Sequence, residues 1–350
     1  MKKLLFQSFH NHTAASDGSM DHLKLVKCAE QHGVGVLAFT DHDALVPEDV
    51  MDRVRRYTGP VTLVTGVELS SWLPYELGGK SPKGLLHIVG LFTDPHNQAL
   101  RRYCEMVQKS RVERVMQIVR NLQGEGFAID MASCIERSKG RTIGRPHISD
   151  VLLDDPDNLK RLKVFARNMC IAAKQNTDIA GRYAKMMQEV KNTGVKGYVF
   201  PLLLASDAFV PDIYVPYLDL ANMEESVSLI RGAGGLVILA HYPTIAEEIP
   251  LPLLRRYLTE GVLDGIETVY GIVKDMPGDD PVMLERLVAE TGCYRSVGAD
   301  VHHAKDFVDF ADAGRFARTP KTLAAILAKA GDDRVRMWRR KHCLIGGKHR

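Results

Sequence analysis

The sequence lacks the cysteine spacing that marks thiolate metal sites and redox motifs. Its six cysteines never form a Cys-x-x-Cys pair, which excludes a zinc knuckle and a dithiol redox centre. Several of them lie among apolar residues, so we expect reduced thiols in the core. The six are Cys28, Cys104, Cys134, Cys170, Cys293 and Cys343.

Long apolar runs are also missing. No stretch approaches the length of a membrane span. The apolar start at Leu4 to Phe6 stops at Gln7 and Ser8, which is too short for the apolar core of a signal peptide. We therefore expect a cytoplasmic protein without membrane contact, and nothing in the sequence indicates a protein partner.

The chain carries little net charge. A formal charge of +3 over 350 residues does not by itself indicate nucleic-acid binding. With 45% apolar and 25% charged residues, the chain has an ordinary globular composition and is long enough for one barrel with an insertion, or for two domains. Residues 334–350 contain basic residues and no acid. This tail is either solvated or contacts an oligonucleotide or another anion.

Apolar periodicity divides the chain into three parts. Residues 1–100 and 216–333 alternate short apolar runs with helical patterns, which predicts an α/β fold with a parallel barrel. Residues 101–215 contain few strand signals and are predicted to be a helical insertion. The expected helices cover 21–33, 159–174, 178–193, 223–232, 281–291 and 320–330, and an apolar stripe joins Met106, Val107, Val112, Val115, Met116, Val119 and Leu122. The Gly- and Pro-containing segment 70–82 is expected to be a loop that could overhang a site.

Several apolar runs end in histidine or a carboxylate. His10 and His12 lie two residues apart, so on an extended segment both imidazoles face one way. Each motif alone is weak, because a turn residue such as Asp17 can cap and a strand-end Asp41-His42 pair can form structural hydrogen bonds. Their joint occurrence predicts one metal site at the C-terminal face of a parallel barrel. Imidazole and carboxylate ligands without thiolate suit Mn, Fe or Zn, and Mg is possible.

The same motifs resemble the polymerase-and-histidinol-phosphatase (PHP) domain family. The resemblance rests on residues 10–18, 38–43, 66–68, 234–241 and 298–302 and spans nearly the whole chain in order. It implies a distorted (β/α)7 barrel that holds two or three divalent metal ions, with Glu68 at the position of a bridging carboxylate. The implied metal ligands are His10, His12, Asp17, His42, Glu68, His87, His241, Asp300 and His302.

One subgroup of this family resembles the chain most. Its members carry a helical insertion and remove the 3′-phosphate from 3′,5′-bisphosphonucleotides, or trim short RNAs from the 5′ end. Residues 142–148 resemble a motif of this subgroup, which implies that Arg145 and His147 contact a substrate phosphate. The alternative is a loop arginine and a capping histidine. Tyr217 stands where the subgroup often has lysine, so a phosphate contact is expected to be weaker there.

Other departures from the family pattern are local. Asn11 replaces a smaller serine between the first two histidines and should not disturb them. Asp43 is followed by Ala44 instead of threonine, and Tyr242 separates His241 from Pro243. These differences bear on the identity of the substrate more than on the type of reaction.

The resulting hypothesis is a metal-dependent phosphoesterase. Clustered cations lower the pKa of a bound water, and a hydroxide bridging the metals attacks phosphorus. His241 and His302 are candidate general acids, and Asp41 and Asp43 are predicted to orient imidazoles. The predicted substrate is a bisphosphonucleotide or a short 5′-phosphorylated oligonucleotide. A histidinol-phosphate-type phosphatase, an amidohydrolase and a non-catalytic scaffold are the alternatives.

Overall fold

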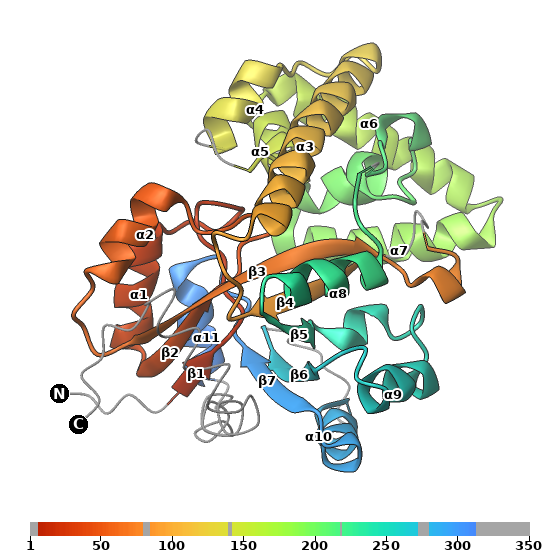
Figure 1. Cartoon of the computed structure of the whole chain (residues 1–350). Helices are drawn as coiled ribbons and strands as arrows, with labels where there is room; N and C mark the ends of the chain where they lie inside the picture. The colour runs from red at the N-terminus through yellow and green to blue at the C-terminus, as the bar shows by residue number, and fades with distance from the viewer. Residues whose placement is uncertain (1–5, 80–84, 139–141, 218, 272–279, 313–350) are drawn as a thin grey trace. The chain divides into compact units, whose positions relative to one another are not determined.

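Seven strands form one mixed sheet in the part of the chain that the computed structural model describes, namely residues 6–79, 85–138, 142–217, 219–271 and 280–312. The strands pair in chain order and the sheet curls into a barrel (Figure 1). The strands are β1 (Phe6–Ser8), β2 (Val34–Phe39), β3 (Thr62–Trp72), β4 (Leu85–Leu91), β5 (Leu236–Leu239), β6 (Gly265–Tyr270) and β7 (Tyr294–Gly298).

Backbone hydrogen bonds nearly close this barrel between its first and last strands. The Phe9 amide donates to the Val297 carbonyl at 2.8 Å, and the His12 amide donates to the Val301 carbonyl at 2.8 Å. Asn11 and Val301 form an isolated parallel bridge. The predicted distorted (β/α)7 barrel is therefore confirmed, and the residues that follow β1 and β7 lie side by side.

The expectation that all strands run parallel is wrong for β4. This strand pairs antiparallel with both β3 and β5. The reason is that β3 and β4 form a long hairpin with seven paired positions, from Gly66 with Leu91 to Trp72 with Leu85. β3 accordingly continues through Trp72, so residues 70–72, which were expected to belong to a loop, are strand.

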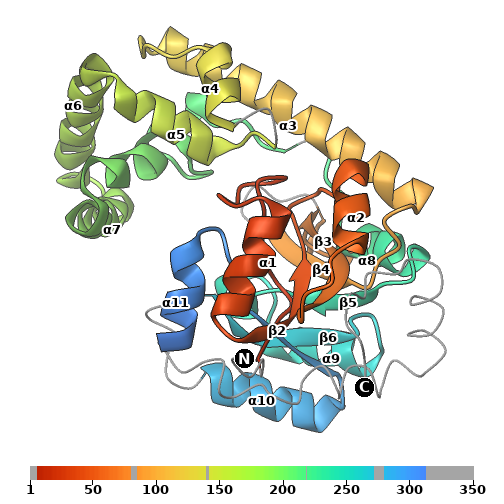
Figure 2. The same ribbon diagram turned by 90° about the vertical axis from the view of Figure 1, so that its left-hand side faces the viewer.

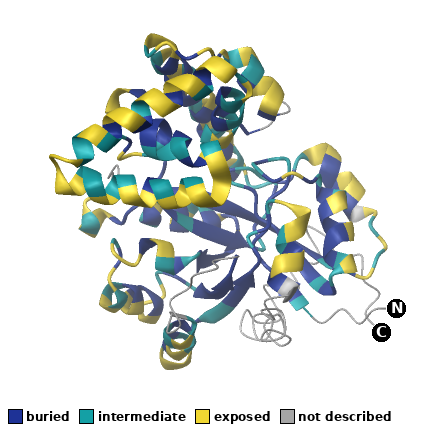
Figure 3. Cartoon of the chain, turned by 180° about the vertical axis from the view of Figure 1, so that it is seen from behind, coloured by how far each residue is buried: buried dark blue, intermediate teal, exposed yellow. Residues whose placement is uncertain are grey.

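Side chains on the two faces of the sheet fill separate cores. Val36, Ala38 and Val64 point into the barrel, together with Phe9 and Ile238. Alternate residues on the same strands, such as Leu37 and Phe39, pack outward against helices. The sheet is therefore buried on both faces, as the blue strands in Figure 3 show.

Helices cover the outside of the barrel (Figure 2), and several of them pack apolar residues on the sheet. Asp21 begins the first helix by accepting a hydrogen bond from the Lys24 amide at 2.9 Å. The helices predicted over 21–33, 223–232 and 281–291 are confirmed. The elements are α1 (His22–Gln31), α2 (Glu48–Arg55), η1 (Tyr75–Leu77), α8 (Met223–Gly232), η5 (Tyr242–Ile245), α9 (Leu251–Thr259), α10 (Asp280–Thr291) and α11 (Ala304–Asp312).

The chain divides into two units: residues 1–107 with 220–350, here called the barrel unit, and residues 108–219, here called the helical unit. The predicted boundaries were 101 and 215. One helix, α3, begins in the barrel unit and ends in the helical unit. The helices of this region are α3 (Gln98–Gly124), α4 (Met131–Ser138), α5 (Arg145–Asp154), α6 (Pro156–Ala173), α7 (Thr177–Thr193), η2 (Gly194–Tyr198), η3 (Phe200–Leu204) and η4 (Pro211–Ile213).

The helical unit has its own apolar core, to which Val115, Val119 and Leu122 of α3 contribute. Helices α6 and α7 confirm the predictions over 159–174 and 178–193. The apolar stripe of α3 is narrower than predicted, because Met106 and Val112 are 45% and 38% exposed.

Three further expectations concern the cysteines, the C-terminal residues and membrane-spanning helices. The five cysteines in the described part of the chain are free, and four of them are buried, as predicted. The helix expected over 320–330 and the basic tail 334–350 lie outside the described residues. No helix among the described residues is both long and apolar enough to span a membrane.

Candidate metal centre

Imidazole and carboxylate side chains gather at one mouth of the barrel. Most follow the C-terminal ends of parallel strands. His87 reaches the same mouth from near the start of β4, because β4 runs antiparallel to β3. In this pairing His87 lies opposite Ser70 of β3. The residues brought together are the nine predicted ligands: His10, His12, Asp17, His42, Glu68, His87, His241, Asp300 and His302.

The donor atoms form overlapping groups within 4.8 Å of one another. Among the described residues the groups are His12, Asp17, His42 and His302; His10, His12 and Glu68; and His42, Glu68 and His87. Asp300 joins them through Oδ1, which lies 3.1 Å from His12 Nε2. His241 Nε2 lies 3.2 Å from His87 Nδ1.

Glu68 stands at the centre of this arrangement. Its side chain is 1% exposed, and neither carboxylate oxygen has a hydrogen bond within the described structure. Imidazole nitrogens surround it at 2.9–3.4 Å, from His10, His12, His42, His87 and His241. One carboxylate thus faces several rings that project from different strands.

The charges in the cluster depend on one another. Burial would raise the pKa of the Glu68 carboxyl, but the charges of His10, His42 and His87 hold it well below its usual value. Burial would lower the pKa of His12, but the carboxylates of Asp300 and Glu68 beside its ring raise it to about 10. Without cations, the carboxylates therefore keep protons on neighbouring imidazoles.

The residues fit a cluster of divalent metal ions. The facing nitrogens of His10 and His12 are 3.1 Å apart, and a buried carboxylate without hydrogen bonds lies beside them. Ligands bound to one ion at about 2.0–2.2 Å lie roughly 3–3.5 Å from each other, so these spacings suit shared coordination. The nitrogen and oxygen donor set favours Mn, Fe or Zn.

Glu267 of β6 is a functional candidate that the sequence analysis missed. It is fully buried, and its Oε1 lies 2.9 Å from His10 Nδ1. Its Oε2 accepts a hydrogen bond from the His241 amide at 3.0 Å. A carboxylate on the outer nitrogen of a ligand imidazole fixes the ring and its tautomer. The available signal was a single charge inside the apolar strand 265–269.

Backbone strain coincides with the cluster. His241 has φ 29° and Asp300 has φ 47°. These values lie in the left-handed region, which residues other than glycine rarely adopt. Glu267 binds the amide of His241, and the carbonyl of His10 accepts from the amide of Asp300 at 3.0 Å. These contacts hold two candidate ligands in conformations that would otherwise cost free energy.

We expect Glu267→Gln to weaken metal binding by about 10- to 100-fold while the protein stays folded, because the amide cannot accept from both partners of the carboxylate. Titration of the metal-free protein with Mn²⁺ measures the effect. Asp264→Asn is the matched control, since Asp264 also accepts from a backbone amide, that of Val237 in β5, at 2.8 Å. Equal affinities for the two variants would refute the role of Glu267.

Asp41 and Asp43 were predicted to orient imidazoles, and the structure gives each of them a backbone partner. Asp41 accepts hydrogen bonds from the Thr13 amide at 2.6 Å and from the Ser16 hydroxyl at 2.6 Å. It reaches His12 through Ser16, whose Oγ lies 3.4 Å from Nδ1 of that ring. Asp43 accepts from the Ser70 amide at 2.9 Å. Asp41 therefore holds the loop after β1.

The two candidate general acids are anchored through their outer nitrogens. His241 Nδ1 lies 3.0 Å from Thr244 Oγ1, and His302 Nδ1 lies 3.0 Å from the Asp300 carbonyl oxygen. Their Nε2 atoms face Glu68 at 3.4 Å and Asp17 at 3.4 Å. This orientation suits ligands, and the role of general acid stays a prediction.

The departures from the family pattern leave the cluster intact. The amide group of Asn11 points away from the two histidines and donates to the carbonyl oxygens of Ser8 and Ala38, each at 2.9 Å. Tyr242 is buried, and its hydroxyl donates to the Ile249 carbonyl at 2.8 Å. The extra residue before Pro243 thus serves packing.

The predicted phosphate contacts belong to the helical unit. Arg145 is half-buried at the start of α5 and donates from Nη1 to the Leu204 carbonyl at 3.0 Å. His147 accepts from the Gly144 amide at 3.1 Å through Nδ1, which is a capping contact. The guanidinium groups of Arg111 and Arg114 lie over the Tyr217 ring. Positive charge is therefore present at Tyr217, although the lysine that is usual in the subgroup is missing there.

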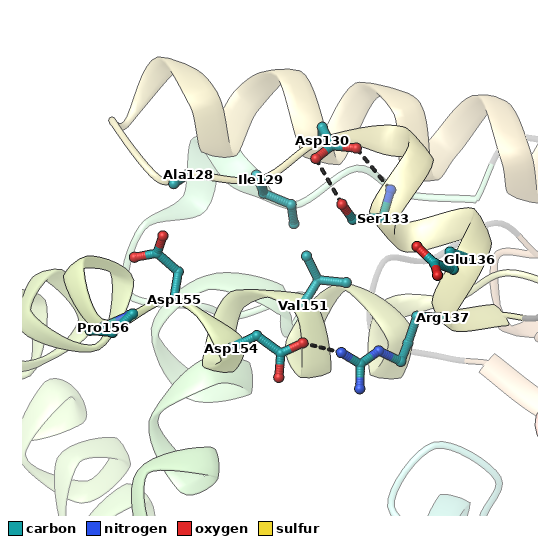
Figure 4. A pocket seen from close by; sticks show the side chains of 10 residues that line it. All are labelled: Ala128, Ile129, Asp130, Ser133, Glu136, Arg137, Val151, Asp154, Asp155 and Pro156. Atoms are coloured by element: carbon teal, nitrogen blue, oxygen red, sulfur yellow. Dashed lines mark hydrogen bonds and ion pairs between the residues drawn. The ribbon is translucent and has the colours of Figure 1, made fainter.

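A cavity of about 760 Å³ also opens in the helical unit, between the ends of α4, α5 and α6 (Figure 4). Three of its carboxylates have structural partners. Asp130 accepts from Ser133 at the start of α4, Asp155 caps α6, and Asp154 pairs with Arg137. No residue of the predicted site lines this cavity.

The chain is similar in sequence to enzymes that are named for cleaving phosphate esters. The 5′-3′ exoribonuclease Rnm of Salmonella typhimurium is 26% identical over 235 residues, which cover 66% of this chain and 64% of that enzyme. The 3′,5′-nucleoside bisphosphate phosphatase of Chromobacterium violaceum is 26% identical over 296 residues, which cover 84% of this chain and 86% of that enzyme. The chain therefore spans less than two thirds of the Salmonella enzyme.

A solved structure shares the fold. It is that of a Bifidobacterium adolescentis protein described as a metal-dependent phosphoesterase, with a TM-score of 0.59 and 22% identity over 85% of this chain and 87% of that one. No protein-family model matches the chain.

Proposed function

We propose that the protein is a metal-dependent phosphoesterase of the PHP type and that its substrate is a 3′,5′-bisphosphonucleotide or a short 5′-phosphorylated oligonucleotide. The observation that carries this proposal is the convergence of nine side chains with nitrogen and oxygen donors, the buried Glu68 among them, at one mouth of the barrel. The bound ions would acidify a water molecule and neutralise charge on the phosphate oxygens.

Different residues of the chain would bind the metal ions, position the ligands and transfer a proton. Nine side chains would hold two or three divalent ions, with Glu68 between them. Glu267 would fix the His10 ring and the His241 backbone. His302 and His241 are the more accessible of the ligand histidines, together with His87, and either could pass a proton to the leaving oxygen.

The nucleotide substrate is supported by the extent of the similarity. The match to the bisphosphate phosphatase covers 84% of the chain, whereas the barrel unit accounts for about two thirds. The similarity therefore includes part of the helical unit. A histidinol-phosphate-type phosphatase and an amidohydrolase remain the alternatives.

A substrate screen tests the proposal. Purified protein with Mn²⁺ should release inorganic phosphate from 3′,5′-adenosine bisphosphate, or mononucleotides from a 5′-phosphorylated oligonucleotide, faster than it hydrolyses histidinol phosphate. Preference for histidinol phosphate would favour the simpler phosphatase. Hydrolysis of none of them with metal bound would overturn the proposal.

We expect Arg145→Ala to raise KM for the bisphosphonucleotide by about 10- to 100-fold, because a charge-assisted pair with phosphate is lost. KM for a small aryl phosphate should stay within about twofold, since that substrate lacks a second phosphate. Steady-state kinetics on both substrates measure the difference, and Arg161→Ala, in the same unit, is the control. Equal changes for both substrates would remove Arg145 from the substrate contacts.

A further inference from the structure

Helix α6 lies at the edge of the helical unit (Figure 2) and presents two different faces. Leu162, Ala166 and Met169 lie on its buried face and join the core of this unit. Residues three, four or seven positions apart share one side of a helix, so the exposed residues on the opposite side form a continuous row. This row is here called the α6 stripe and consists of Lys163, Val164, Arg167, Ile171 and Lys174.

The cations of the α6 stripe have no counter-charge. Residues 158–177 contain five lysines and arginines and no acid. Two of these cations have partners, since Lys160 pairs with Asp157 and Arg161 donates to the carbonyl of Glu125. The three in the stripe form no ion pair with any residue that the structure describes. They follow one another along about 16 Å of helix, because each residue adds about 1.5 Å.

Two aliphatic side chains lie beside these cations. Val164 is 58% exposed and Ile171 is 52% exposed. A helix that anchors in a membrane surface presents bulky residues such as Trp, Phe or Leu. The α6 stripe contains none of these, because Phe165 packs against the core of the helical unit. The stripe therefore combines a repeated positive charge with an apolar area that is too small for a membrane anchor.

We propose that the α6 stripe binds the backbone of a single-stranded oligonucleotide. Phosphodiester groups carry one negative charge in each nucleotide, and this repeated charge complements the row of cations. Lys163, Arg167 and Lys174 would contact phosphates, and Val164 and Ile171 would pack against sugars or bases. The inference rests on the proposed function in that the bound strand is the oligonucleotide substrate, held at nucleotides other than the one that is cleaved.

Strand binding by the full-length protein tests the stripe without catalysis. The protein is freed of metal and kept in EDTA, so that the strand stays intact. The probe is a fluorescent 5′-phosphorylated oligoadenylate of about twelve nucleotides, within the length that single-strand sites cover. Fluorescence anisotropy follows binding over a range of KCl concentrations. Each neutralised phosphate contributes about 0.7 to the slope of log affinity against log salt, so three contacts supply about two units of that slope.

The stripe variant combines Lys163→Gln, Arg167→Gln and Lys174→Gln. We expect it to lose about two units of the salt slope and to bind the strand at least about tenfold more weakly at low salt, because three phosphate contacts are lost. Adenosine 5′-phosphate has no phosphodiester backbone, so its affinity for the variant should stay within about twofold of that for the wild type.

The control variant combines Lys27→Gln, Arg53→Gln and Arg286→Gln, which removes the same charge from exposed positions of the barrel unit. It should bind the strand as the wild type does, with the same salt slope. Circular dichroism should show that both variants are folded. If the stripe variant does not fold, Arg167→Gln alone takes its place, with an expected loss of about 0.7 units of slope.

Equal affinities and salt slopes in the wild type and the stripe variant would overturn the proposal. Binding to vesicles of phosphatidylserine and phosphatidylcholine that needs the stripe, while strand binding does not, would assign the stripe to a membrane surface instead. A protein that binds the strand through the stripe but hydrolyses no phosphate ester would contradict the proposed function and support the stripe. Hydrolysis of 3′,5′-adenosine bisphosphate with unchanged strand binding by the stripe variant would do the reverse.

Discussion

Glu68→Gln is expected to abolish most metal binding and to reduce phosphoester hydrolysis by at least about a thousandfold, or about 4 kcal/mol of lost transition-state stabilisation. The physical reason is the position of this carboxylate, which faces five imidazoles at 2.9–3.4 Å in the described structure. Gln keeps the size of the side chain but removes the negative charge that the bridging position needs.

Elemental analysis and steady-state kinetics of the variant measure these effects. Glu105→Gln is the control, because Glu105 is exposed on α3 within the barrel unit. Circular dichroism should show a folded protein in both cases. Full metal content and near wild-type activity in Glu68→Gln would show that Glu68 is not a ligand.

Metal affinity is expected to rise with pH and to be accompanied by proton release. In the metal-free cluster the pKa of His12 is raised to about 10. Burial would lower the pKa of His10, but Glu68, Glu267 and Asp300 raise it well above its usual value. Both rings therefore carry protons at neutral pH, and a cation must displace them. His87 differs, because burial lowers its pKa.

The size of the effect follows from linkage. At a pH below the pKa of the imidazole, each proton that the metal displaces makes the metal affinity rise by up to about tenfold per pH unit. Two displaced protons therefore predict that the metal affinity increases by up to about 10⁴-fold between pH 6 and pH 8. Calorimetry with Mn²⁺ in buffers of different ionisation enthalpy counts the protons released. Affinity that does not change with pH, together with an enthalpy that does not depend on the buffer, would contradict the protonated cluster.

The sequence was sufficient to predict those features that depend on local order. His10 and His12 share a face because extended residues alternate, and apolar runs locate the strand ends before His42 and His241. Helices α3, α6 and α7 of the insertion followed from their periodicity, whereas α4 and α5 were not predicted. In each case the relevant spacing lies within one element.

Features that depend on pairing between elements could not be predicted in this way. The antiparallel direction of β4 arises from its hairpin with β3, and it brings His87 to the mouth from the other end of a strand. The partner of Glu267 is His10, 257 residues away. The direction of the Asp41 side chain depends on the loop after β1, whose Thr13 and Ser16 bind it.

The burial of Arg111 and Arg114 is a further example. The sequence places them between apolar positions of α3, which would usually put them in solvent. In the structure Tyr214 and Tyr217, about a hundred residues later, cover Arg114. Only the fold of the helical unit shows that these charges lie together.

The central claim is that the nine gathered side chains bind cations. Elemental analysis of the full-length protein, purified without chelator and dialysed against Mn²⁺ at pH 8, tests it most directly. We expect roughly two or three equivalents of Mn, Fe or Zn in each chain, as for a phosphoesterase that uses clustered metal ions. A chain that holds less than roughly a tenth of an equivalent after this treatment would contradict it.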